Sequence, residues 1–292
     1  MQARSGEELL QICEERNISL AEYAIEMEME KSGDSRETVI ERMRKTIKVM
    51  IDSATEGMEK EVYSVSGLIG GDGYKIHEYL KSNKTLTGTT TVLAMAMALS
   101  SSEVNASMGR IVACPTAGSC GILPAVILAA GGKLNKTEDE LIMGLFASAA
   151  IGTIIAMNAT VSGAEGGCQA ECGSAAAMAS AATVYMMGGS TKQSLDAAAI
   201  VLKNILGLVC DPVAGLVEIP CAKRNAAGAV SALCTADLVM AGVESKIPFD
   251  DTVSAMYKVG RQLPPSLRET AMGGVAITKT GIELRKKVFG EE

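Results

Sequence analysis

Three long runs without a charged residue constrain what this chain can fold into. They cover residues 111–132, 141–164 and 172–191. Each is long enough to span a membrane. However, Pro115 and Pro124 interrupt the first, polar residues interrupt the second, and the third is mostly Ala, Ser, Gly and Met. We therefore expect no membrane association, and we predict that the runs form central helices that pack closely through small residues.

Helix-start signals precede several amphipathic segments. Ser5 and Ser19 are each followed three residues later by a glutamate, which is the pattern of a capping box. Ser35 precedes apolar residues at helical spacing, and Thr137 with Glu140 gives the same signal before the second uncharged run. The spacing predicts helices that begin after each of these residues.

Patterns of alternating polar and apolar residues, which are typical of β-strands, are almost absent. We therefore predict an all-α fold with a single helical domain over residues 1–292. Within it, residues 1–60 are expected to form peripheral helices, and residues 61–292 are expected to form the core that holds the functional site.

The composition limits the classes of partner. The net charge is −7 at pH 7 and there is no basic stripe, which argues against a nucleic-acid surface. The chain has eight cysteines and no secretory signal pattern. We therefore expect a cytoplasmic protein whose cysteines are not paired in disulfides.

Cysteines in glycine-rich stretches are the main chemical signal. Cys168 lies in GAEGGCQAECGSA, and Cys210 and Cys221 lie in GLVCDPVAGLVEIPC. Thiolates in such a setting favour metal ligation or redox exchange, and three of them suit a [4Fe–4S] cluster with one iron free of protein ligands. The spacing matches neither a ferredoxin nor a paired zinc site. Cys13 and Cys234 lie among apolar helical residues and are predicted to fill the core.

A second glycine-rich stretch covers residues 64–73, with four glycines between residues 67 and 73. Such a loop presents backbone N–H groups to a carboxylate or phosphate, but a tight turn between helices explains the same composition. It matches neither a P-loop nor a dinucleotide-binding motif. The single histidine, His77, follows in a pattern typical of a solvent-facing helix.

Together, the stretches SGLIGGDG, CPTAGSCGILPA, MNATVSGAEGGCQAECGSA, CDPVAGLVEIPCAKRNA and RETAMGG closely resemble the iron–sulfur-dependent L-serine dehydratases. The resemblance covers nearly the whole chain and is to the α chain of the two-subunit form, or to the catalytic half of single-chain members. It implies deamination of L-serine to pyruvate and ammonia with a [4Fe–4S] cluster and without pyridoxal phosphate. It also implies that Cys168, Cys210 and Cys221 bind the cluster, with Cys172 beside the ligands and Cys120 in a packed pocket wall.

The reaction that the resemblance implies needs help at two groups of the substrate. An iron with an open site can stabilise the charge that develops on the leaving hydroxyl. The substrate carboxylate needs hydrogen-bond donors, and the candidates in the glycine-rich loops are Ser66, Gly67, Thr116, Gly118 and Ser119.

Four further polar residues have two interpretations each. Asn158 is either a helix-packing residue or a substrate contact. Arg224 either supplies positive charge near the cluster or a substrate carboxylate, or forms a surface ion pair. Glu165 and Glu171 are the only charges between residues 141 and 191, and each either takes part in the chemistry or caps a helix N-terminus.

The base that removes the Cα proton has no clear candidate in the chain. Lys75 and Lys84, near the glycine-rich loop, are the internal alternatives to His77 if they are buried. The resemblance implies a β subunit, so we expect a hetero-oligomer in which the partner brings a histidine. The N-terminal helices and residues 64–73 are the expected docking surface.

Two other functional classes remain open. One is a related iron–sulfur enzyme that acts on a thiol substrate, such as a cysteine desulfidase. The other is a non-enzymatic scaffold that carries a cluster.

Overall fold

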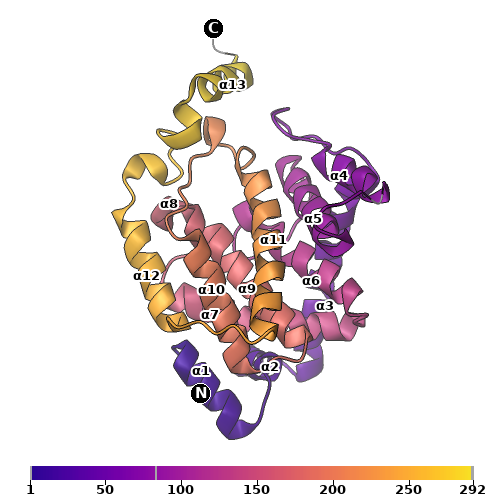
Figure 1. Cartoon of the computed structure of the whole chain (residues 1–292), viewed down its shortest axis with the longest axis vertical. Helices are drawn as coiled ribbons and strands as arrows, with labels where there is room; N and C mark the ends of the chain where they lie inside the picture. Colours follow the sequence, from indigo (N-terminus) through magenta and orange to yellow (C-terminus); the bar gives the residue numbers. More distant parts are fainter. Residues whose placement is uncertain (1, 83, 291–292) are drawn as a thin grey trace.

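The chain is built from helices and connecting loops (Figure 1). The structure is a computed structural model that describes residues 2–82 and 84–290. Thirteen α-helices follow one another in that part of the chain: α1 (Gly6–Arg16), α2 (Leu20–Ser32), α3 (Arg36–Glu59), α4 (Asp72–Lys81), α5 (Thr89–Ala106), α6 (Ile122–Lys133), α7 (Glu138–Asn158), α8 (Gly163–Gly166), α9 (Ser174–Met186), α10 (Thr191–Ile205), α11 (Cys221–Met240), α12 (Phe249–Gln262) and α13 (Lys279–Phe289). A π-helix, η2 (Gln169–Gly173), precedes α9, and the 3-10 turns are η1 (Ala117–Ser119), η3 (Val213–Gly215), η4 (Pro265–Leu267) and η5 (Gly274–Ile277). The described residues form two isolated β-bridges and no strand, so the all-α prediction is confirmed.

The helix starts are where the sequence predicts them. Ser5, Ser19 and Ser35 are the N-caps of α1, α2 and α3, and each side chain accepts a hydrogen bond from the backbone N–H three residues later. Thr137 caps α7 in the same way, and Glu140 completes a reciprocal capping box. Such caps satisfy N–H groups that have no partner inside the helix.

Helix α9 lies at the centre of the fold and packs against α6, α7, α10 and α11 (Figure 1). Nearly all of its residues are buried, and most are alanine or serine, so neighbouring backbones can approach closely. Among the described residues, α7 is the helix whose length and composition would allow it to cross a membrane, and 56% of its apolar window is buried inside the fold. The uncharged runs therefore supply core helices, as the sequence predicts.

Helix α3 joins the N-terminal helices to the core by a close approach to α5. The N–H of Gly57 donates to Ser100 Oγ at 2.8 Å, and Ser100 Oγ donates to the Ser53 carbonyl at 2.7 Å. A Cβ atom at Gly57 would lie 2.9 Å from Ser100 Cα. The contact therefore depends on glycine at position 57. The predicted division at residue 60 stays a prediction.

Glu103 of α5 is a buried carboxylate, 1% exposed, that anchors the start of α4. It accepts hydrogen bonds from the N–H groups of Asp72 at 2.6 Å and Gly73 at 3.3 Å, and a helix N-terminus favours a negative charge. Asp72 also pairs with Lys75 and with Lys223 of α11. Burial is the largest influence on the carboxyl group of Glu103 and, against the opposing hydrogen bonds, raises its pKa to about 7.

Glu103→Gln should change how stability depends on pH. The pKa of Glu103 is raised in the folded protein, so the folded state holds a proton that the unfolded state releases, and stability is lost as pH rises through about 4.5 to 7. The free energy of unfolding of the wild type, relative to Glu103→Gln, should fall by about 3 kcal/mol across this range. Urea denaturation at several pH values measures it, with Glu283→Gln on the exposed face of α13 as the control. A difference that does not change with pH would contradict this account.

Candidate functional site

Three buried thiols from separate elements lie within electrostatic reach of one another. Cys168 directly precedes η2, Cys210 follows α10 in a loop, and Cys221 is the first residue of α11. These residues are 2%, 3% and 7% exposed, and none is in a disulfide. Burial raises the pKa of both Cys210 and Cys221, and the charge of Cys168 raises it further. The fold thus brings together the three cysteines that the sequence motifs single out.

Gly167 and Gln169 shape the backbone on either side of Cys168. Gly167 has a φ of +77°, and a Cβ atom there would lie 2.8 Å from the carbonyl oxygen of Leu208. Glycine is therefore required for both conformation and space. The side-chain amide of Gln169 donates to two backbone carbonyls, at 3.0 and 2.9 Å, and accepts from the N–H of Gly207 at 2.8 Å. These bonds fix the loop that carries Cys168.

Asn225 holds Cys221 against the glycine-rich turn after Pro115. Its Nδ2 donates to the carbonyl of Gly118 at 2.7 Å and to that of Cys221 at 2.9 Å, and its Oδ1 accepts from the N–H of Gly121 at 2.9 Å. Asn225 is 104 to 107 residues from the two glycines in sequence. One buried amide thus sets the distance between the turn and the start of α11.

The segment that carries Cys210 pairs with the RETAMGG segment near the C-terminus. The N–H of Cys210 donates to the carbonyl of Leu267 at 2.9 Å, and the carbonyl of Cys210 accepts from the N–H of Glu269 at 2.8 Å. These two bonds form a parallel bridge between Cys210 and Arg268. The C-terminal segment is therefore part of the thiol site.

Cys168 and Cys172 form a thiol pair with opposite pKa shifts. Their sulfur atoms are 3.4 Å apart. The hydrogen bond from Cys172 lowers the pKa of Cys168 against the opposing effect of burial, and the charge of Arg224 lowers it further. The same hydrogen bond, together with burial, raises the pKa of Cys172 well above its ordinary value. Of the two thiols, Cys168 is thus the one whose surroundings favour the thiolate form.

Arg224 supplies the positive charge at this pair and is itself held by the protein. Its Nη1 donates to the carbonyl of Val209 at 2.8 Å, and its Nη2 lies 2.9 Å from Asp211 Oδ1. The side chain of Asp211 is 3% exposed, so this ion pair is buried. The surface ion pair that the sequence left open is therefore wrong, because the loop of Cys210 covers the guanidinium.

The predicted donors to a substrate carboxylate already contact carboxylates of the protein. Ser66 Oγ donates to Glu218 at 2.7 Å, and Thr116 Oγ1 donates to Glu171 at 2.9 Å. The hydroxyl of Ser119 lies 3.2 Å from that of Thr116. A Cβ atom at Gly118 would lie 3.2 Å from the Glu171 carboxylate, whereas one at Gly67 would contact nothing within 4 Å. That these five residues bind the substrate stays a prediction.

Glu171 is a site residue whose position the sequence did not reveal. It is 9% exposed, accepts from Thr116 Oγ1, and also bonds to the N–H of Gly163 at the start of α8. Glu171 thus interacts with the start of α8, as the sequence allowed, and it does so at the thiol site. Burial is the largest influence and raises the pKa of this carboxyl group. The signal in the sequence that could have found Glu171 is a charged residue isolated in a long uncharged region.

The other candidates have different surroundings. Asn158 Nδ2 donates to the carbonyls of Arg4 and Ile154, at 2.7 and 2.9 Å, which ties the end of α7 to the N-terminal segment. These bonds are the ones expected if Asn158 is a helix-packing residue. His77 is half-buried on α4, and its Nδ1 lies 2.8 Å from the carbonyl oxygen of Met58.

Both lysines offered as internal bases are exposed. Lys75 also pairs with Asp72, and this hydrogen bond raises the pKa of the lysine, which keeps it protonated. Lowering the pKa of a lysine toward neutrality requires burial. Neither Lys75 nor Lys84 has that environment.

The remaining cysteines are mostly in packed positions. Cys13, Cys114 and Cys120 are buried, and Cys120 Sγ donates to the carbonyl of Ser101 at 3.8 Å. The prediction that Cys234 fills the core is wrong, because it lies on the exposed face of α11. Its apolar sequence neighbours are buried on the opposite face of the same helix.

The donor set suits an iron–sulfur cluster better than a single metal ion. Within residues 2–82 and 84–290, no three His, Cys, Asp or Glu side chains come close enough together to hold one ion. A [4Fe–4S] cluster distributes its cysteine ligands over different irons, so its thiols need not converge on one point. Three buried and unpaired thiols, with Arg224 beside Cys168, fit such a group.

Comparison with known proteins gives the family. A family model described as the serine dehydratase alpha chain matches residues 15–276. The chain belongs to this family. The probable L-serine dehydratase alpha chain of Bacillus subtilis is 48% identical over 98% of this chain and 95% of its own length. The L-serine dehydratase alpha chain of Peptoniphilus asaccharolyticus is 46% identical over 98% of both chains. L-serine dehydratase TdcG of Escherichia coli is 35% identical over 94% of this chain, which spans 61% of that longer protein.

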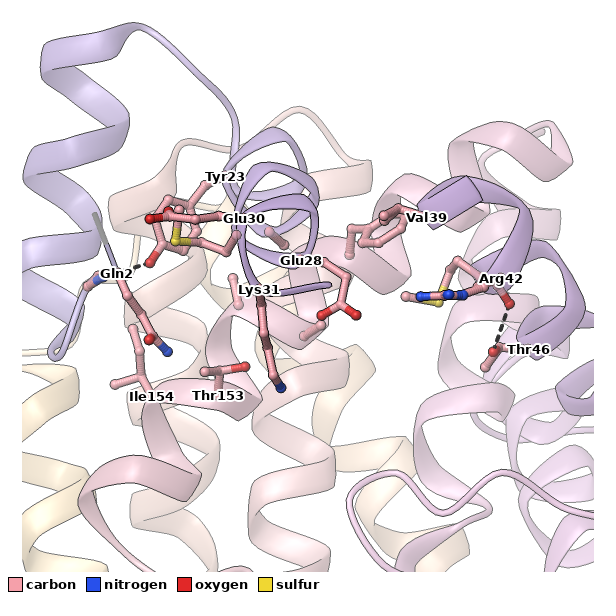
Figure 2. Close-up of a pocket in the computed structure, with 17 residues that line it drawn as sticks. Gln2, Tyr23, Glu28, Glu30, Lys31, Val39, Arg42, Thr46, Thr153 and Ile154 are labelled. Carbon is pink, nitrogen blue, oxygen red and sulfur yellow. Dashed lines mark hydrogen bonds between the residues drawn. The ribbon is translucent and has the colours of Figure 1, made fainter. Parts of the chain in front are cut away.

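A separate surface cavity of about 580 Å³ lies between α2, α3 and α7 (Figure 2). Glu28 and Lys31 of α2 line it, with Arg42 of α3 and with Thr153 and Ile154 of α7. No cysteine lines this cavity. In this member of the serine dehydratase family, the cavity and the three thiols are therefore separate parts of the molecule.

Gly163→Ala should destabilise the thiol site. A Cβ atom at Gly163 would lie 2.6 Å from Glu171 Oε2 and 3.1 Å from Cys210 Sγ. Overpacking of this kind should lower the free energy of unfolding by about 1–3 kcal/mol, measured by chemical denaturation. Gly132→Ala is the matched control, because Gly132 is exposed in α6 with nothing within 4 Å of the added methyl group. Equal stabilities for the two variants would show that the site relaxes freely.

Proposed function

We propose that this chain is the α subunit of an L-serine dehydratase that converts L-serine to pyruvate and ammonia, with a [4Fe–4S] cluster held by Cys168, Cys210 and Cys221 and without pyridoxal phosphate. The observation that carries the proposal is the set of three buried cysteines, none in a disulfide, which separate elements contribute to one site. The names of the alpha-chain relatives support the substrate and the reaction. We also propose a cytoplasmic location, in keeping with eight cysteines and no disulfide.

The residues around the thiols have distinct tasks in this proposal. When bound, a cluster with an iron free of protein ligands supplies Lewis acidity toward the substrate hydroxyl. Arg224 favours the thiolate form of Cys168, which is the form that binds metal. Gly118 and Gly163 leave space around the buried Glu171 carboxylate. The buried surroundings exclude water, which strengthens every electrostatic interaction inside the site.

The three proposed ligands should be necessary for the cluster, and the other cysteines should not. Cys168→Ala, Cys210→Ala and Cys221→Ala should each abolish the visible absorbance of the cluster after anaerobic reconstitution, because each removes one thiolate ligand. Cys13→Ala and Cys234→Ala should retain it and serve as controls. Cys172→Ala should also retain it, because Cys172 lies beside the proposed ligands and is not one of them. Loss of the cluster in Cys172→Ala as complete as in Cys168→Ala would make Cys172 a ligand.

We propose that a second subunit supplies the base for the Cα proton. His77 contacts the Met58 carbonyl, and Lys75 and Lys84 are exposed. The alpha-chain names of the relatives imply a partner, and TdcG extends well beyond the length that this chain matches. A hetero-oligomer in which the partner brings a histidine to the thiol site accounts for both observations. Histidine is the usual group that is poised to take a proton near pH 7.

The test compares the anaerobically reconstituted chain alone with the complex that it forms in its host. The chain alone should bind a cluster but release little pyruvate from L-serine, and the complex should turn over. His77→Ala should leave turnover of the complex unchanged. Full turnover by the chain alone, abolished by His77→Ala or Glu171→Gln with the cluster retained, would place the base in this chain.

The same assay separates the competing functions. A preference for L-cysteine, with release of sulfide, would indicate a cysteine desulfidase. A cluster-loaded complex that acts on neither amino acid would indicate a scaffold.

A further inference from the structure

The RETAMGG segment places a second arginine, Arg268, beside a proposed cluster ligand. Arg268 pairs with Cys210 through backbone hydrogen bonds on both of its sides, from Cys210 to Leu267 and from Glu269 to Cys210. Residues paired in this way lie side by side and direct their side chains to the same face. Arg268 is therefore fixed next to Cys210, although 58 positions separate the two in sequence.

The guanidinium of Arg268 has a nitrogen without a hydrogen-bond partner. Its Nε is buried and donates no hydrogen bond. Among residues 2–82 and 84–290, no carboxylate forms an ion pair with it. A buried donor without an acceptor is costly, and buried polar groups in proteins are nearly always paired. An anionic ligand that enters the site would satisfy it.

The other donors at the site are already used. Ser66 donates to Glu218, Thr116 donates to Glu171, and Arg224 binds the Val209 carbonyl and Asp211. The glycine-rich turn at Gly118 also faces the Glu171 carboxylate. A second carboxylate placed at that turn would be repelled by the first, because like charges at short range oppose each other. The negative group of a substrate is therefore better accommodated at a positive group, and Arg268 supplies one beside Cys210.

The backbone after Arg268 is held in an unusual conformation. Glu269 and Ala271 have φ values of +63° and +55°, which few residues other than glycine adopt. The bond from the Glu269 N–H to the Cys210 carbonyl helps to hold this shape. Strain of this kind persists where the surroundings enforce it, and it is concentrated at ligand-binding sites.

We infer that Arg268 binds the α-carboxylate of the amino-acid substrate. The inference rests on the proposed function and adds to it a residue that selects for the substrate class. The planar guanidinium can donate two parallel hydrogen bonds to a carboxylate, and lysine cannot reproduce this geometry. Arg268 thus serves the substrate, whereas Arg224 serves the thiol pair.

The test replaces Arg268 and the substrate carboxylate separately. Arg268→Gln, Arg268→Lys and the exposed control Arg285→Gln are purified anaerobically in the host complex, and the cluster absorbance of each is recorded. The KM for L-serine and the inhibition constant for L-serinamide, whose carboxylate is replaced by a neutral amide, are then measured. Arg268→Gln should raise the KM for L-serine about 10- to 100-fold, the loss expected for a hydrogen bond to a charged group. Arg268→Lys should recover part of this loss, and Arg285→Gln should resemble the wild type.

The second substrate distinguishes a carboxylate contact from general damage. L-serinamide should bind Arg268→Gln and the wild type equally well, because it has no carboxylate to lose. An equal loss of affinity for L-serine and L-serinamide, or an unchanged KM for L-serine, would overturn the inference. If Arg268→Gln loses the cluster, the affinities for L-serine and L-serinamide are compared in Arg268→Lys instead. A wild-type complex that does not act on L-serine would instead refute the proposed function.

Discussion

The site depends on helix and loop backbones that approach one another closely because only small residues stand between them. Helix α9 is mostly alanine and serine, so α6, α7, α10 and α11 can surround it. Gly163 and Gly167 continue this property into the loop before Cys168, where a Cβ atom would collide with Glu171 or with the Leu208 carbonyl. Because protein interiors are close-packed, the absent methyl groups create the space in which the thiols and the carboxylate meet.

Hydrogen bonds between residues far apart in the sequence then hold the helices and loops in the positions that the small residues allow. Asn225 links the start of α11 to the turn at Gly118, and the pairing of Cys210 with Arg268 joins the loop after α10 to the C-terminal segment. Asn225 and Cys210 are both buried, so breaking these bonds would leave polar groups without a partner. The proposed ligands are thus positioned by residues that do not themselves contact a metal.

Local signals in the sequence predicted local structure well. Ser5, Ser19, Ser35 and Thr137 cap helices because capping needs only a few neighbouring residues. The core helices followed from long uncharged runs, and the three thiols followed from motifs and a family resemblance.

The sequence did not show pairings that only the tertiary fold creates. The partners of Ser66, Thr116 and Arg224 lie in other motifs, so the sequence could not show that these polar groups were already in use. Cys234 was misplaced because its apolar sequence neighbours lie on the other face of α11. The position of Glu171 needed the fold, because its contacts come from η1 and the start of α8.

The bridge between Cys210 and Arg268 also has a consequence for the order of assembly. A ribosome makes the chain from its N-terminus, so Cys168, Cys210 and Cys221 all emerge before the segment that pairs with Cys210. The nascent chain therefore holds the three proposed ligands before the segment that pairs with Cys210 has been made. The backbone partner of Cys210 is thus the last part of the thiol site to be made.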